Sequence, residues 1–145
     1  MRLLSVNRKR QGQCPPSLRV TKDALPDRAP YAKTRAMTDA ALARENPILA
    51  KFRAALAEMY SDRLERVVLY GSRARGDAEP DSDYDLAVFL KDLTDYWAES
   101  NKLALATSDI LSDTGMLIHA MPFPAGSYQE RTMLMHEIRR EGLDL

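Results

Sequence analysis

The strongest constraint on the fold is a pair of short apolar runs on either side of a polar stretch. Arg66–Tyr70 and Tyr84–Leu90 are rich in Val, Leu, Phe and Tyr and have the length of buried strands. Gly71 ends the first run, and the acidic, proline-containing segment Asp77–Asp81 has the composition of a turn. The pattern predicts two strands that bring polar residues together at their ends.

Helical patterns flank these strands. Asn46-Pro47 is typical of a helix start, and the apolar residues behind it repeat at helical spacing to about Tyr60. A second helix is expected from Thr94 to Ser112, with Gly115 ending it. Trp97, the only tryptophan, is interpreted as a core or interface residue.

The C-terminal third predicts one more strand and one more helix. Met116–Met121 is the third apolar run, and Pro122 and Pro124 are expected to close it. Ser127 through Glu130 fits a capping box, which predicts a last helix to Gly142. The element order is therefore α-β-β-α-β-α, an α/β (α+β) fold with a small mixed sheet flanked by helices.

Charge divides the chain into a tail and a domain. Residues 1–36 hold nine Lys or Arg against two Asp, a balance of +7, whereas residues 37–145 hold 12 basic and 19 acidic side chains. Low hydrophobicity, several prolines and net charge predict a disordered tail over 1–36, or a misassigned start before Met37. Residues 37–145 form the predicted domain. Nucleic-acid binding by the tail is not expected, because Tyr31 is its only aromatic residue.

Composition also bears on the compartment. Cys14 is the only cysteine, so neither a disulfide nor a multi-cysteine metal site can form within one chain. No apolar run approaches the roughly 20 residues that a membrane span needs. We therefore expect a cytoplasmic protein that does not contact a membrane.

The residues that follow the first strand have the composition of a phosphate-binding turn. Gly71 lets a backbone approach a phosphate closely, and the Ser72 hydroxyl can donate to a phosphate oxygen. Arg73 and Arg75 bring guanidinium groups to the same place. We expect all four residues to bind a nucleotide.

Two carboxylates stand where the second strand begins. Because side chains alternate along a strand, Asp83 and Asp85 share one face, about 7 Å apart along the strand, and Tyr84 points away. Such a pair repels itself unless a hard cation such as Mg²⁺ lies between the carboxylates and binds substrate phosphates as well. Asp83 and Asp85 are therefore the predicted metal ligands and catalytic residues.

The stretch GSRARGDAEPDSDYD resembles the motif of the DNA polymerase β-like nucleotidyltransferase superfamily. It looks like the minimal branch, whose members are often antitoxins encoded beside a HEPN-domain toxin. By that resemblance Gly71 and Ser72 would hold the triphosphate, and Asp83 and Asp85 the metal. Arg75, Gly76 and Ser82 would be supporting positions, with Ser82 near the nucleotide. The resemblance is dense over 67–90 and does not include the tail.

The resemblance implies transfer of AMP from MgATP to a hydroxyl of a partner protein, the HEPN-type toxin. Active members usually add a third carboxylate on a later strand, but His119 is the only titratable residue of Met116–Met121. The base could be His119, or it could be absent, with metal coordination activating the acceptor. Two alternatives stay open: a silent binding antitoxin, and an enzyme acting on small molecules.

Overall fold

The computed structural model describes residue 39 and residues 41–145, so the predicted tail over 1–36 lies outside the described residues. The elements in chain order are α2 (Pro47–Tyr60), the 3₁₀ helix η1 (Ser61–Arg63), β1 (Leu64–Tyr70), α3 (Gly71–Arg75), β2 (Tyr84–Leu90), α4 (Tyr96–Thr114), β3 (Ile118–Pro124), the 3₁₀ helix η2 (Ala125–Gln129), α5 (Met133–Glu141) and β4 (Leu143–Asp144). Within this described part, no helix has both the length and the apolar character for crossing a membrane.

The sheet has four strands in the order β3-β2-β1-β4. Strand β1 is antiparallel to β2 and to β4, whereas β2 and β3 are parallel. Parallel neighbours need a crossover, and α4 supplies it. The predicted mixed sheet is thereby confirmed. Strand β4 escaped sequence analysis because its two residues are too few to show a pattern.

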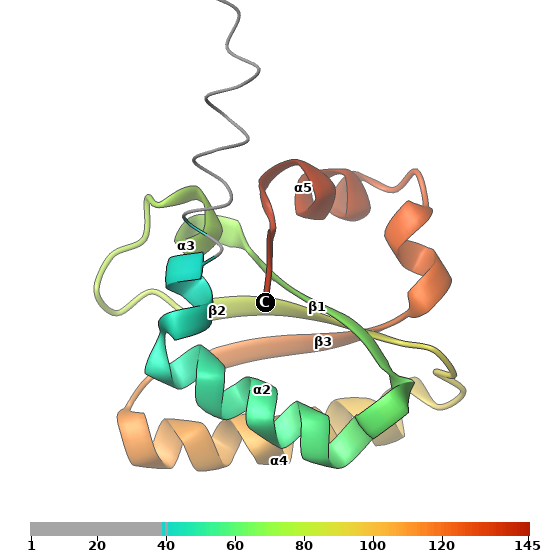
Figure 1. Ribbon diagram of the computed structural model, residues 1–145, viewed down its shortest axis with the longest axis horizontal. Coiled ribbons are helices and arrows are strands. Elements are labelled where there is room, and N and C mark those ends of the chain that lie inside the picture. Colours follow the sequence, from blue (N-terminus) through green and yellow to red (C-terminus); the bar gives the residue numbers. More distant parts are fainter. Residues whose placement is uncertain (1–38, 40) are drawn as a thin grey trace, which may run out of the picture.

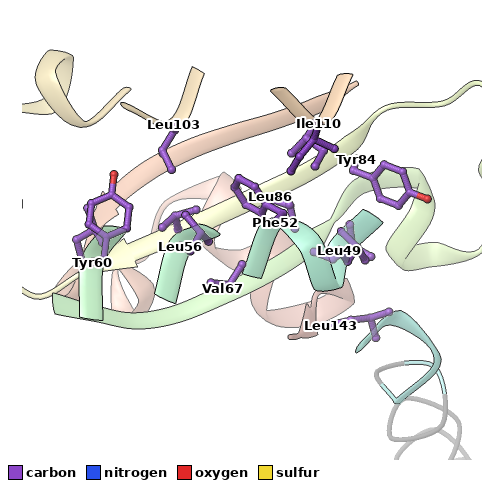
Figure 2. Close-up of a cluster of buried hydrophobic side chains, with 14 residues drawn as sticks. Leu49, Phe52, Leu56, Tyr60, Val67, Tyr84, Leu86, Leu103, Ile110 and Leu143 are labelled. Atoms are coloured by element: carbon purple, nitrogen blue, oxygen red, sulfur yellow. The ribbon is translucent and has the colours of Figure 1, made fainter. Parts of the chain in front are cut away.

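Helices cover both faces of the sheet (Figure 1). Helices α2 and α4 lie on one face, where Phe52, Leu56 and Leu103 pack with Leu86 in the larger of two apolar clusters (Figure 2). Helix α5 lies on the other face and contributes Met135 and Ile138 to the second cluster. Strand β2 is central and apolar on both faces, so every residue from Leu86 to Leu90 is buried.

Two of the predicted helix ends are confirmed by their caps. The side-chain oxygen of Asn46 accepts from the amides of Ile48 and Leu49 at 2.9 and 3.3 Å, as expected for an N-cap. Gly115 ends α4 in the left-handed conformation, with φ of +72°. The start of α4 lies slightly later than expected, because Asp95 rather than a residue before Thr94 caps it.

Two expectations for the C-terminal part are wrong. Strand β3 does not close at Pro122 but runs through it to Pro124, because β3 is an edge strand that tolerates a missing amide donor. The Ser127 hydroxyl does donate to Glu130, at 3.1 Å, but this pair belongs to η2. Helix α5 begins only at Met133, and Thr132 caps it.

Trp97 is not a core residue. Its exposed fraction is 75%, and its ring contacts Tyr96 edge-on at 5.4 Å between centroids. The first turn of α4 therefore places its aromatic residues at the surface, and the helix is anchored to the sheet by Leu103 and Ile110 further along.

Candidate active site

A short turn at the end of β1 brings backbone against a carboxylate. Gly71 begins α3 with φ of +74°, a conformation that glycine adopts at little cost. A Cβ added there would lie 2.5 Å from Oδ2 of Asp85. The missing side chain thus allows the turn to approach Asp85 closely, which is the juxtaposition that the sequence pattern predicts.

The strand alternation around Asp85 is as predicted. Tyr84 is 5% exposed and packs in the cluster beneath α2, where its hydroxyl accepts from the Asn46 side chain at 3.1 Å. Asp85 lies on the opposite face of β2, with its side chain 33% exposed. Asp83 comes one residue before the strand and is exposed. Alternation therefore places the Asp85 carboxylate away from α2. The shared face of Asp83 and Asp85 stays a prediction, because Asp83 lies before the strand.

Asp85 is the middle member of a row across three strands. Tyr70 on β1 and His119 on β3 are its direct neighbours in register. His119 Nδ1 lies 3.4 Å from Asp85 Oδ1, and its side chain is 60% exposed. Burial, and then the charge of Asp85, raise the pKa of the Tyr70 phenol, which is therefore protonated at neutral pH.

Arg73 is held by the loop that precedes β2. Its Nε and Nη2 donate to the Ser82 carbonyl at 2.8 and 2.6 Å, and Nη2 also donates to the Pro80 carbonyl at 3.1 Å. The guanidinium carbon lies 4.0 Å from the centre of the Tyr84 ring. The two carbonyls and the Tyr84 ring thus contact one edge and one face of the Arg73 guanidinium. The predicted contact of Arg73 with a phosphate stays a prediction.

The remaining predicted binding residues lie around the same turn. Arg75 Nε donates to Asp77 at 3.1 Å, and its Nη1 donates to Glu141 at 3.4 Å. The Ser82 hydroxyl accepts from the Glu79 amide at 2.9 Å. The Ser72 hydroxyl has no hydrogen-bond partner within the described residues, and the residue is partly exposed. Ser72 is therefore the hydroxyl of this group that is available to a ligand.

The predicted ligands Asp83 and Asp85 are suited to Mg²⁺ that arrives with a nucleotide, rather than to a metal ion held by protein side chains alone. Among the described residues, no three His, Cys, Asp or Glu side chains form a group that could hold a metal. Mg²⁺ commonly takes one or two carboxylates and completes its shell with phosphate oxygens and water. Gly71 brings the turn within contact distance of Asp85, so phosphates bound at that turn would lie beside that carboxylate. The site residues thus fit Mg²⁺ provided that the substrate supplies ligands.

A cavity of about 340 Å³ lies beside α3 and the start of α2. Arg73, Arg75, Tyr84 and Asn46 line it, but Asp83, Asp85, Gly71 and Ser72 do not. The predicted metal ligands and the Gly71-Ser72 pair therefore lie outside this cavity, whereas the predicted nucleotide-binding residues Arg73 and Arg75 line it.

Sequence patterns missed two neighbours of the site. Tyr70 contacts Asp85 only because β1 and β2 pair in one particular register, and the length of the loop does not specify that register. Asn46 was recognised as a cap, but its bond to Tyr84 joins residues 38 positions apart. A sequence pattern over a few residues cannot predict a contact between residues so far apart in the chain.

Comparison with known proteins places these residues in a family. The family described as a nucleotidyltransferase domain matches residues 49–133, more than half of the chain. The protein named "Putative protein adenylyltransferase MJ0141" of Methanocaldococcus jannaschii is 37% identical over 46 residues. That alignment covers 32% of this chain and 46% of the relative, so it spans less than half of the relative's length.

Two solved structures match part of this chain. One is a crystal structure of a toxin–antitoxin with AMP-PNP, with 19% identity, a TM-score of 0.47 and coverage of 64% of this chain and 68% of that one. The other is a mutant of the toxin–antitoxin MntA-HpeT, with 17% identity, a TM-score of 0.46 and coverage of 63% and 68%. Similarity this low does not indicate what this chain does or what it binds.

The family match includes every residue predicted for the site, from Gly71 to Asp85. The nucleotidyltransferase resemblance drawn from GSRARGDAEPDSDYD is confirmed by this match, and the predicted mixed sheet by the strand order. This chain belongs to the nucleotidyltransferase domain family.

Proposed function

We propose that this domain transfers AMP from MgATP to a hydroxyl group of a partner protein. The observation that carries the proposal is the contact between the Gly71 turn and the Asp85 carboxylate. It supports a site in which backbone amides after Gly71 and the Ser72 hydroxyl hold the phosphates, beside carboxylates that hold a cation. Arg75 and Ser82 support that site from the same turn and loop.

The proposed reaction is a substitution at the α-phosphorus. The acceptor oxygen forms a bond to that phosphorus, the bond to the bridging oxygen breaks, and pyrophosphate leaves with the electron pair. The hydroxyl proton is released to solvent. Mg²⁺, when bound, would neutralise phosphate charge and favour loss of the acceptor proton. Asp83 and Asp85 would hold the ion, and Ser72 would orient the triphosphate.

Two observations favour a protein as the acceptor of the AMP group. Asp83 and Asp85 do not line the cavity bounded by Arg73 and Tyr84. The Asp85 side chain is 33% exposed, so an acceptor on a large partner could reach it. The M. jannaschii relative is named a putative protein adenylyltransferase, and that name supports a protein acceptor here. We propose a HEPN-type toxin as the partner, on the resemblance of GSRARGDAEPDSDYD to antitoxins of that pairing.

ATP labelled at the α-phosphate, compared with ATP labelled at the γ-phosphate, tests this function. The chain is incubated with Mg²⁺ and the purified product of a co-transcribed gene, and intact mass is measured in parallel. We expect the partner to gain one adenylyl group and to retain only the α-label. Asp83→Asn and Asp85→Asn are expected to abolish the gain while leaving the melting temperature within a few degrees, because both side chains are at least partly exposed.

The same experiment separates the alternatives. Neutralisation of the partner without a gain in mass, equal in wild type and Asp83→Asn, would mean that the domain acts by contact alone. Retention of the γ-label would mean phosphoryl transfer instead. Either result would refute the proposed reaction.

A further inference from the structure

We infer that Arg73 is a positioning residue that fixes the loop carrying Asp83 relative to helix α3, which begins at Gly71. This inference deepens the proposed function and rests on it, because it assumes that Asp83 binds a metal. Its basis is the set of contacts that the Arg73 guanidinium makes with the residues on both sides of Asp83.

The residue before Asp83 is held through its carbonyl. Ser82 accepts two hydrogen bonds from Arg73, at 2.6 and 2.8 Å. The Ser82 amide donates to the Glu79 carbonyl at 3.1 Å, and the Ser82 hydroxyl accepts from the Glu79 amide at 2.9 Å. Arg73 also binds the Pro80 carbonyl at 3.1 Å. The turn over residues 79–82 is thus closed on itself and attached to Arg73.

The residue after Asp83 is held through its ring. The Arg73 guanidinium lies 4.0 Å from the centre of the Tyr84 ring, within the range of a cation–π contact. Tyr84 is 5% exposed and its hydroxyl accepts from Asn46, the cap of α2. The ring is therefore a fixed surface, and Asp83 stands between two residues that one guanidinium holds.

Arg73 also belongs to the turn itself. It lies two residues after Gly71 in α3, so the same side chain links the backbone beside Asp85 to the loop that carries Asp83. Planar guanidinium geometry is essential to this link, since one group must donate to two carbonyls and lie over a ring. A lysine keeps the charge but cannot make these contacts together. Substitution by lysine therefore separates positioning from simple attraction of phosphate.

The test uses the full chain and a non-hydrolysable ATP analogue with a methylene bridge between the α- and β-phosphorus. Its affinity is measured by isothermal titration in EDTA and in Mn²⁺, and the ratio gives the contribution of the metal. For Arg73→Lys we expect the affinity in EDTA to stay within about twofold. We expect the metal contribution to fall by about tenfold or more, as for other residues that orient metal ligands.

Arg66→Lys is the matched control. Arg66 donates twice to Asp144 at 3.0 Å, and its guanidinium lies 4.3 Å from the centre of the Tyr128 ring, away from the predicted site. We expect its affinities to equal those of wild type. Hydrogen exchange supplies a readout without ligand: the Glu79 and Ser82 amides should exchange faster in Arg73→Lys and at the wild-type rate in Arg66→Lys.

Three results would overturn the inference. A loss of affinity in EDTA with an unchanged metal contribution would identify Arg73 as a phosphate ligand. Equal binding and equal exchange in Arg73→Lys and wild type would show that the contacts position nothing. An Arg73→Lys chain that is unfolded at every temperature would assign the residue to global stability. A wild-type chain in which Mn²⁺ adds no affinity would instead refute the proposed function.

Discussion

Replacement of Gly71 by alanine gives the sharpest test of the predicted site. The residue has φ of +74°, and a left-handed conformation costs a non-glycine residue about 1–2 kcal/mol. The new methyl group would also lie 2.5 Å from Asp85 Oδ2, well inside contact distance. Because that oxygen is the end of a side chain, the carboxylate is expected to turn away rather than unfold the domain.

The chain contains a matched control for the backbone strain. Gly115 has φ of +72°, and a Cβ there would meet nothing within 4 Å. Gly115→Ala therefore imposes the same conformational cost without moving a carboxylate. A loss of about 1 kcal/mol corresponds to a decrease in melting temperature of roughly 4–8 °C in a domain of this size. Both variants should show that decrease.

Ligand binding should separate the two variants. Gly71→Ala is expected to lose about tenfold or more of its affinity for MgATP, because Asp85 no longer faces the phosphates. Gly115→Ala is expected to bind as wild type does. Thermal denaturation and isothermal titration measure both quantities. Wild-type affinity in Gly71→Ala, or an equal loss in both variants, would refute the assignment of Asp85 and the Gly71 turn to one site.

Two further predictions concern other residues. His119→Ala should reduce transfer to the partner by less than about tenfold, because metal coordination activates the acceptor; a loss of about 100-fold or more in intact-mass assays would identify His119 as the base. Glu99 is buried and paired with Arg63 and Lys102 at 3.0 and 3.2 Å, so Glu99→Gln should cost about 1–2 kcal/mol in denaturant unfolding at pH 7. Burial opposes ionisation of Glu99, but the bonds from Arg63 and Lys102 prevail and lower its pKa below the ordinary 4.5. Its contribution is therefore present above that value and disappears as pH falls through the folded-state pKa, where the two chains should become equally stable; a difference that persists there would refute this cause.

Local patterns were sufficient for most of the secondary structure. Strand β2 was predicted with its observed bounds because a run of seven residues, all apolar except Asp85, lies between turn-forming segments. Helix α2 was predicted because Asn46-Pro47 starts a helix through interactions within the first turn, which any such sequence can make. The Ser127–Glu130 pattern misled because the same side-chain bond forms in a 3₁₀ turn, and only packing selects between the two.

In the predicted site, too, some features follow from local sequence and others only from the tertiary structure. Strand alternation places Asp85 and Tyr84 on opposite faces in any β-strand, so the sequence alone determined that Asp85 faces away from the Tyr84 cluster. The register between strands did not follow from the sequence, because it depends on how the whole sheet packs. That register makes Tyr70 and His119 the neighbours of Asp85. Tertiary structure likewise directs Arg73 to the loop before Asp83, since its partners lie seven to eleven positions away and no local rule selects carbonyls over phosphate.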